Sequence, residues 1–246
     1  MHFDIATVHQ LYRFKQHFDT VFIDEVEAFP LSMDPNLSLA IQTASKAIHS
    51  HIYMTATPPR QLIKQMSSHN VIKLPALFHI QPLPVPHFKH FKLNTSRVQS
   101  QLIHLFQAQI KQQRYTLVFF NHIETIKDAY HKYRAHIPNL ICVYSEDVYR
   151  FDKVEALRRG EHSIVFTTTI LERGFTMARL DVIVINAETF SKAALIQIAG
   201  RVGRKMEEPK GLVLFLHEGV SLSMIKAKKD ITEMNRLGYE RGWLDA

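Results

Sequence analysis

Val21-Phe22-Ile23-Asp24-Glu25-Val26-Glu27-Ala28-Phe29-Pro30 is the stretch that decides the fold of this 246-residue chain. Its first three residues are apolar and β-prone, which predicts a buried parallel strand. Asp24 and Glu25 follow at the carboxyl end of that strand, where open α/β sheets bind ligands. In a nucleotide hydrolase, Asp24 would hold Mg²⁺ through water and Glu25 would orient or deprotonate the attacking water. The stretch alone leaves a second interpretation open, a strand end with two solvated acids.

A second short strand is predicted at residues 52–54, before Thr55-Ala56-Thr57-Pro58-Pro59. The two prolines end the strand, and its hydroxyl-bearing end places Thr55 and Thr57 at the same sheet edge as Asp24. The surrounding pattern predicts further elements in this half of the chain. They are strands at 5–8 and 71–74 and helices at 9–16, 37–48 and 60–66.

Residues 75–94 contain four prolines, which cannot sustain a helix or a central strand, so we predict a linker there. After it the chain alternates between helices and strands. Such alternation predicts an α/β fold with a parallel sheet covered on both sides. The predicted helices are 96–112, 123–134, 151–159, 193–202 and 221–237, and the predicted strands 116–120, 140–144, 163–167, 182–186 and 211–216. The expected domains are therefore 1–74 and 95–246.

Composition narrows the class of protein. The chain has 30 Lys and Arg against 23 Asp and Glu, a net charge of +7 and a pI near 9.4, which suits a polyanionic partner such as nucleic acid. Its one cysteine, Cys142, excludes an intrachain disulfide. No apolar run reaches the length of a membrane span, and the first residues lack the pattern of a signal peptide, so the expected location is the cytoplasm. The His49/His51 and His87/His90 pairs have no acidic or thiol neighbours, which argues against a metal site.

Gln197-Ile198-Ala199-Gly200-Arg201-Val202-Gly203-Arg204-Lys205 is the strongest functional signal. We expect its two arginines, three apart on a helix, to share one face. Glycine beside each arginine allows close approach of a backbone or ligand. A planar, permanently charged guanidinium is suited to stabilising a γ-phosphoryl group during transfer. A basic surface loop is the alternative.

Thr167-Thr168-Thr169-Ile170-Leu171-Glu172-Arg173-Gly174-Phe175-Thr176 is the next signal. Hydroxyls after a buried strand, followed by a glycine, suit a turn whose backbone amides bind phosphates. A threonine that merely caps a helix is the alternative interpretation.

In order along the chain, these four stretches resemble motifs II, III, V and VI of superfamily 2 helicases. The variants Asp-Glu-Val-Glu-Ala-Phe-Pro (24–30), Thr-Ile-Leu-Glu-Arg-Gly (169–174) and Glu-Met-Asn-Arg-Leu (233–237) are narrower. They resemble the ComFA family of late-competence ATPases, which is associated with DNA uptake in natural transformation. Ala-Thr-Val-His-Gln-Leu (6–11) also fits this family.

The resemblance implies two RecA-like domains of the P-loop NTPase type, with ATP and Mg²⁺ bound between them and single-stranded DNA lying across both. It also implies a peripheral position at the inner face of the membrane, through partners in the DNA-uptake machinery. Each matching residue then has an implied role. Asp24 binds Mg²⁺ through water, Glu25 activates water, Arg201 and Arg204 reach the γ-phosphate with Gln197 beside them, Arg173 and Gly174 face the nucleotide, and Thr55, Thr57 and Thr168 couple it to DNA.

The chain departs from this family in one respect. Its eight glycines all lie at position 160 or beyond, and no Gly-Lys-Thr or Gly-Lys-Ser P-loop occurs. The family's four-cysteine zinc module is also absent. We therefore expect the carboxy-terminal part of a longer protein, from a truncated reading frame, an internal start or an expressed segment. Its first domain would be incomplete and weakly stable, and the chain alone inactive.

Three alternatives to an ATP-dependent motor stay open. The first is a non-catalytic RecA-like fragment that binds DNA or an uptake partner, and the second is a decayed fragment without a role. The third is a superfamily 2 helicase of another branch, acting in DNA repair or on RNA.

Overall fold

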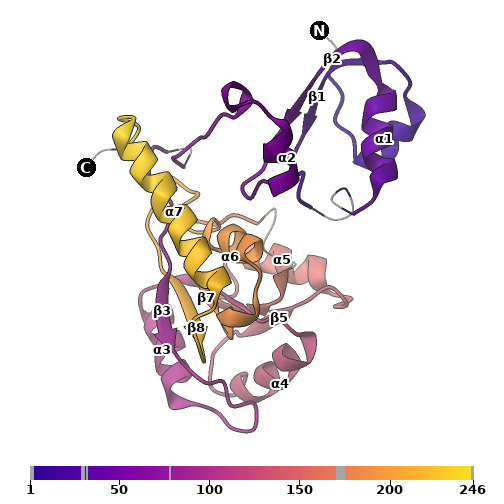
Figure 1. Cartoon of the computed structure of the whole chain (residues 1–246). Helices are drawn as coiled ribbons and strands as arrows, with labels where there is room; N and C mark the ends of the chain where they lie inside the picture. The colour runs from indigo at the N-terminus through magenta and orange to yellow at the C-terminus, as the bar shows by residue number, and fades with distance from the viewer. Residues whose placement is uncertain (1–2, 29–30, 32, 78, 170–174, 245–246) are drawn as a thin grey trace. The chain divides into compact units, whose positions relative to one another are not determined.

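The computed structural model describes residues 3–28, 31, 33–77, 79–169 and 175–244. The chain divides into two compact units, Met1–Ile72 (unit 1) and Lys73–Ala246 (unit 2), which are described separately (Figure 1). None of the helices in the described part of the chain is both long and apolar enough to cross a membrane.

Unit 1 is built on two parallel strands, β1 (Phe18–Ile23) and β2 (Ser45–Tyr53). The helix α1 (Pro35–Ala44) joins them; Pro35 opens it, and the Asp34 side chain caps it by accepting the Asn36 amide at 2.9 Å. Two 3₁₀ helices, Val8–Arg13 and Ser68–Asn70, and the short α2 (Arg60–Gln65) complete the unit. Its small core contains these buried residues: Leu11, Ile23, Ala40, Ile41 and Ala44.

Several predictions for unit 1 are wrong. The predicted strands at 5–8 and 71–74 do not form, and the helix predicted at 37–48 ends at Ala44, because Ser45 is already extended and begins β2. β1 is parallel as predicted but not fully buried: Ile23 packs toward α1, whereas Phe22, on the opposite face, is 57% exposed. Two strands with one helical layer leave the other sheet face uncovered among the described residues.

Unit 2 contains a six-stranded parallel sheet in the order β3-β8-β7-β4-β6-β5, which confirms the predicted α/β fold. Its strands are β3 (His87–His90), β4 (Tyr115–Phe119), β5 (Ile141–Val143), β6 (Ile164–Thr167), β7 (Leu180–Val184) and β8 (Val213–His217). The helices are α3 (Ser100–Lys111), α4 (Ile123–Tyr133), α5 (Arg150–Arg158), α6 (Lys192–Ala199) and α7 (Leu222–Glu240), with a 3₁₀ turn at Ala187–Thr189.

Two buried clusters cover the two faces of this sheet. One joins it to α3 and α4 through residues such as Phe106 and Ile126, and the other to α5, α6 and α7 through Leu157, Ile198 and Met224. Central strands buried on both faces explain why their sequences are continuous apolar runs rather than alternating ones.

β3 lies within residues 75–94, the segment predicted to be a linker, and pairs in parallel with β8. The division between the units falls earlier, after Ile72. The proline-rich run ends at Pro86, immediately before β3, so no proline interrupts the ladder. Proline density predicted the loop correctly up to that point but missed the edge strand after it.

Candidate functional site

In unit 1, the acidic pair stands at the carboxyl end of β1. Asp24 is exposed, and its Oδ1 accepts the Glu25 amide at 2.9 Å. Glu25 has a φ of +48°, an uncommon left-handed conformation for a residue other than glycine. The tight turn at this point directs the chain away from the strand as soon as the sheet ends.

The hydroxyl-rich segment after β2 joins this turn. Thr57 is 9% exposed, and its Oγ1 donates to Glu27 Oε1 at 3.1 Å, while its amide donates to Thr55 Oγ1 at 3.0 Å. The amide of Met54 donates to the Ile23 carbonyl at 2.8 Å, which holds the two strand ends together. The structure thus brings Thr55 and Thr57 to the same edge as Asp24. Glu27, a member of the same acidic stretch with no role predicted from the sequence, thus also belongs to this edge.

This donor set fits a magnesium ion bound through water. Mg²⁺ prefers one or two carboxylate oxygens and retains several waters, and Asp24 offers an exposed carboxylate at a strand end. In the part of the chain that the structure describes, no three His, Cys, Asp or Glu side chains gather as a denser metal site.

In unit 2, α6 carries Gln197, which is 8% exposed, and ends at Ala199 before the arginine turn (residues 200–204). Arg201 is 3% exposed and its Nη1 donates to the Phe175 carbonyl at 3.2 Å. Arg204 is exposed, and its Nε donates to the Gly200 carbonyl at 2.6 Å. The prediction that both arginines share a helix face is wrong, because the helix ends before them and they occupy different environments.

Glycine at position 203 is required by the shape of this turn. Gly203 has a φ of +77°, and a Cβ there would lie 2.5 Å from the Pro209 carbonyl oxygen. The chain after the arginines therefore folds back on the turn, with its own backbone packed against Gly203.

The threonine segment meets the arginine turn at its described end. Thr168 is half-buried directly after β6, and its carbonyl accepts the Thr167 hydroxyl at 3.1 Å. Phe175 is buried and supplies the carbonyl that Arg201 binds. Arg173 and Gly174, two of the predicted nucleotide-facing residues, lie outside the described residues.

A buried ion pair between Arg114 and Asp181, which the sequence did not predict, binds the chain at residues 210–212. Asp181 is 3% exposed and accepts from the Arg114 guanidinium and from the Leu212 amide at 2.8 Å. Arg114 also donates to the Lys210 carbonyl at 3.0 Å. A Cβ on Gly211 would lie within 2.7 Å of both members of the pair and 2.6 Å from Val202 of the arginine turn. The ion pair therefore sits directly behind this turn.

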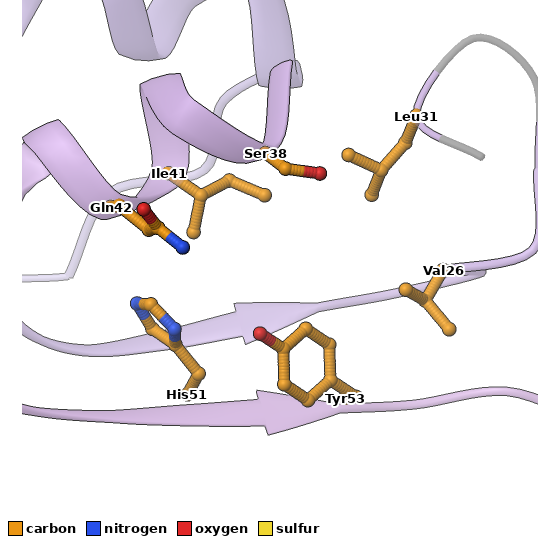
Figure 2. Close-up of a pocket in the computed structure, with 7 residues that line it drawn as sticks. All are labelled: Val26, Leu31, Ser38, Ile41, Gln42, His51 and Tyr53. Atoms are coloured by element: carbon orange, nitrogen blue, oxygen red, sulfur yellow. The ribbon is translucent and has the colours of Figure 1, made fainter. Parts of the chain in front are cut away.

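Unit 1 has an open pocket of about 170 Å³ between α1 and β2 (Figure 2). Its volume is below the roughly 300 Å³ at which small-molecule sites usually begin. None of the predicted site residues lines it; the lining consists of Val26, Leu31, Ser38, Ile41, Gln42, His51 and Tyr53. The pocket therefore adds nothing to the candidate site.

His51, on the wall of this pocket, is expected to make unit 1 less stable in mild acid. Ser45 Oγ donates to the Ile41 carbonyl at 2.8 Å, so His51 Nε2, also 2.8 Å from that oxygen, is the donor in their bond. Burial and, secondarily, the nearby His49 lower the pKa of His51 from its ordinary value of 6.5. Because unfolding then favours proton uptake, stability should fall as the pH drops below about 6.5.

Hydrogen exchange of the β1 and β2 amides at about pH 7.5 and pH 5.5, corrected for intrinsic rates, measures this effect. The acid-induced loss of protection should be smaller in a His51→Gln variant. An equal loss in both proteins would exclude His51 as its source.

Residues 97–206 match the helicase conserved C-terminal domain family. The chain is 36% identical over 242 residues to competence protein ComFA of Bacillus subtilis, covering 95% of this chain and 52% of that protein. It is also 36% identical over 246 residues to ComFA of Streptococcus pneumoniae, covering 94% and 56%. The chain thus spans about half the length of these relatives.

A more distant relative and two solved structures also resemble the chain over most of its length. The ATP-dependent DNA helicase RecG of Synechocystis is 29% identical over 205 residues, 77% of this chain and 24% of that protein. Dbp5 of S. cerevisiae bound to RNA and ADP BeF3 has a TM-score of 0.63 at 14% identity, over 93% of this chain and 61% of that one. Lhr of Mycobacterium smegmatis bound to ssDNA and AMP-PNP has a TM-score of 0.58 at 18% identity, over 94% and 32%.

The likeness to these solved structures shows a RecA-like fold. Residues 97–206 therefore match the helicase conserved C-terminal domain family, in a chain that is 36% identical over most of its length to two ComFA competence proteins.

Proposed function

We propose that this chain is the part of an ATP-dependent DNA motor that carries the acidic pair for Mg²⁺ and water and an arginine for phosphate, and that the motor moves single-stranded DNA during DNA uptake. The observation that carries the proposal is the position of the matching residues. Asp24 and Thr168 each stand directly after a parallel strand, and Thr55 stands two residues after one, at the carboxyl edges where α/β sheets bind ligands. The identity to two competence proteins supports the DNA-uptake role.

Each residue has a role in this proposal. Asp24 holds Mg²⁺ through water and Glu25 orients the attacking water, as such pairs do in phosphoryl transfer. Arg204, exposed at the arginine turn, contacts the γ-phosphoryl group. Buried Arg201, bound to the Phe175 carbonyl, instead holds the threonine segment against that turn. ATP supplies the free energy for movement when it is bound and hydrolysed.

Part of an ATP site is not encoded in these 246 residues. A P-loop cradles the β- and γ-phosphates with glycine amides and a lysine, and no such sequence occurs here. The residues present therefore fit Mg²⁺ and a phosphoryl group but do not fit a whole nucleotide. This absence favours a second candidate for the chain alone, a non-catalytic fragment that binds DNA or an uptake partner.

A DNA-repair or RNA helicase of another branch has weaker support. RecG and the transcription-repair-coupling factor of Helicobacter pylori are 29% and 25% identical to the chain, against 36% for ComFA. The comparison therefore favours the competence branch.

Single-stranded DNA binding is expected to weaken at least about tenfold between about 50 and 200 mM salt, because lysines and arginines on a chain of net charge +7 release counterions from phosphates. Fluorescence anisotropy of a labelled oligo-dT measures this change. Glu25→Gln, which removes one negative charge without altering the basic residues, should retain the same salt dependence. Absent binding, or an affinity indifferent to salt, would contradict the nucleic-acid role.

ATP hydrolysis by the same samples, with and without the oligo-dT, separates the two candidates. We expect none from the 246-residue chain. Hydrolysis that DNA stimulates and that Glu25→Gln abolishes would mean that the phosphates are held by other groups, and would assign the motor activity to this chain itself.

A further inference from the structure

Residues 73–85, hereafter the strap, lead from the end of unit 1 into unit 2 and are held by α7. Arg241 Nη1, just after α7, donates to the Lys73 carbonyl at 3.0 Å. The side chain of Asn235, only 8% exposed, accepts the Leu83 amide at 2.7 Å and donates to its carbonyl at 2.9 Å. The described residues of the strap form no helix or strand, yet side chains of unit 2 bind it at Lys73 and at Leu83.

Between these anchors the strap has a loop whose described residues are 77 and 79–81. The Leu77 amide donates to the Gln81 carbonyl at 3.0 Å, and Ile80, with a φ of +60°, donates back to the Leu77 carbonyl at 2.9 Å. These two bonds hold Leu77 close to Ile80 and Gln81.

The loop contacts the arginine turn at two adjacent residues. His79 Nε2 lies 2.7 Å from the Arg204 carbonyl oxygen, to which it donates. Leu77 Cδ1 lies 3.3 Å from the place that a Cβ on Gly203 would occupy. Gly203 is thus enclosed between Leu77 and the Pro209 carbonyl, and the Arg204 backbone is bound from the side of the strap.

We infer that His79 is a positioning residue for Arg204, and that the strap thereby sets where the Arg204 guanidinium lies. This inference gives Arg204 the role described under the proposed function and rests on it. The Arg204 side chain is bound to the Gly200 carbonyl within its own turn, so its direction follows the shape of that turn. The hydrogen bond from His79 to the Arg204 carbonyl restricts the backbone of the arginine turn at Arg204. The strap therefore contacts the backbone of Arg204, the arginine proposed to contact phosphate.

The test follows the Arg204 Nε–H resonance of the ¹⁵N-labelled 246-residue chain, assigned by its disappearance in Arg204→Lys. His79→Ala removes the donor to the Arg204 carbonyl. The turn that holds the Arg204 Nε–H against the Gly200 carbonyl then has one hydrogen bond fewer, so we expect exchange of this proton with water to accelerate about fivefold. His79→Gln retains a side-chain N–H at similar reach and should restore most of the protection. His87→Ala, an exposed histidine on β3, is the matched control and should change nothing.

Thermal unfolding of all variants is recorded alongside. A purely structural role for His79 would lower the melting temperature without a selective change at Arg204, and that result would overturn the inference. An unchanged Arg204 exchange rate in His79→Ala would overturn it as well. The NMR measurement needs neither DNA nor ATP, so a failure of the proposed function, seen as absent DNA binding, remains distinguishable from a failure of this positioning role.

Discussion

Limited proteolysis of the 246-residue chain should cut unit 1 first, about a hundredfold faster than unit 2, and leave a resistant fragment that contains unit 2. Such a ratio corresponds to about 3 kcal/mol of difference in the free energy of opening. The expectation comes from the two cores. The buried cluster of unit 1 has five residues in the described chain, two of them alanines, whereas both sheet faces of unit 2 are covered by much larger clusters.

The uncovered face of the β1–β2 sheet adds to this difference. Phe22 is 57% exposed, Ile52 41% and Met54 42%, so apolar side chains contact water where a further layer would normally cover them. A two-stranded sheet is also marginal without more strands or a second packed layer. Unit 1 should therefore open often enough for a protease to reach its backbone.

Mass spectrometry of the fragments over time measures the order of cleavage. The Asp181→Ala variant, in which unit 2 is weakened, serves as the control. Its two units should be cleaved at more similar rates. Equal resistance of both units in the unsubstituted chain would contradict a weakly stable unit 1.

Asp181→Ala should destabilise unit 2 by about 3–5 kcal/mol, because it leaves Arg114 buried without its main carboxylate partner. Asp181 and Arg114 side chains are 4% and 11% exposed, and Asp181 also accepts the Leu212 amide. The loss of a buried acceptor thus strands two donors at once. Since the pair lies behind Val202 and the arginine turn, the same change should also loosen residues 201–204.

Urea unfolding monitored by circular dichroism measures this change in stability. Asp181→Asn keeps an acceptor for the Leu212 amide and should lose less stability than Asp181→Ala. Asp230→Ala is the matched control, because it breaks the exposed pair with Lys192, whose side chains are 42% and 47% exposed, and should cost under about 1 kcal/mol. An Asp181→Ala chain as stable as the Asp230→Ala chain would show that the buried pair does not support the fold.

The sequence by itself determined the class of fold and most of unit 2. Buried parallel strands are continuous apolar runs and helices repeat every 3.6 residues, so both signals are local. β4, predicted at 116–120 and found at Tyr115–Phe119, and α4, predicted at 123–134 and found at Ile123–Tyr133, show how closely such signals fix an element. Asp24, Thr55 and Thr57 were likewise placed at one edge, because parallel strands end on the same side.

Only the tertiary structure decided the features that depend on partners distant in sequence. His79 binds a carbonyl 125 residues away, Asn235 binds Leu83 across 152 residues, and Arg114 finds Asp181 across 67. Likewise, Arg201 is buried beside Phe175 while Arg204 is exposed, although both follow the same short helix. A pattern along the chain specifies which face of an element is apolar. The neighbour that covers a polar side chain depends instead on how elements distant in sequence pack together in the folded protein.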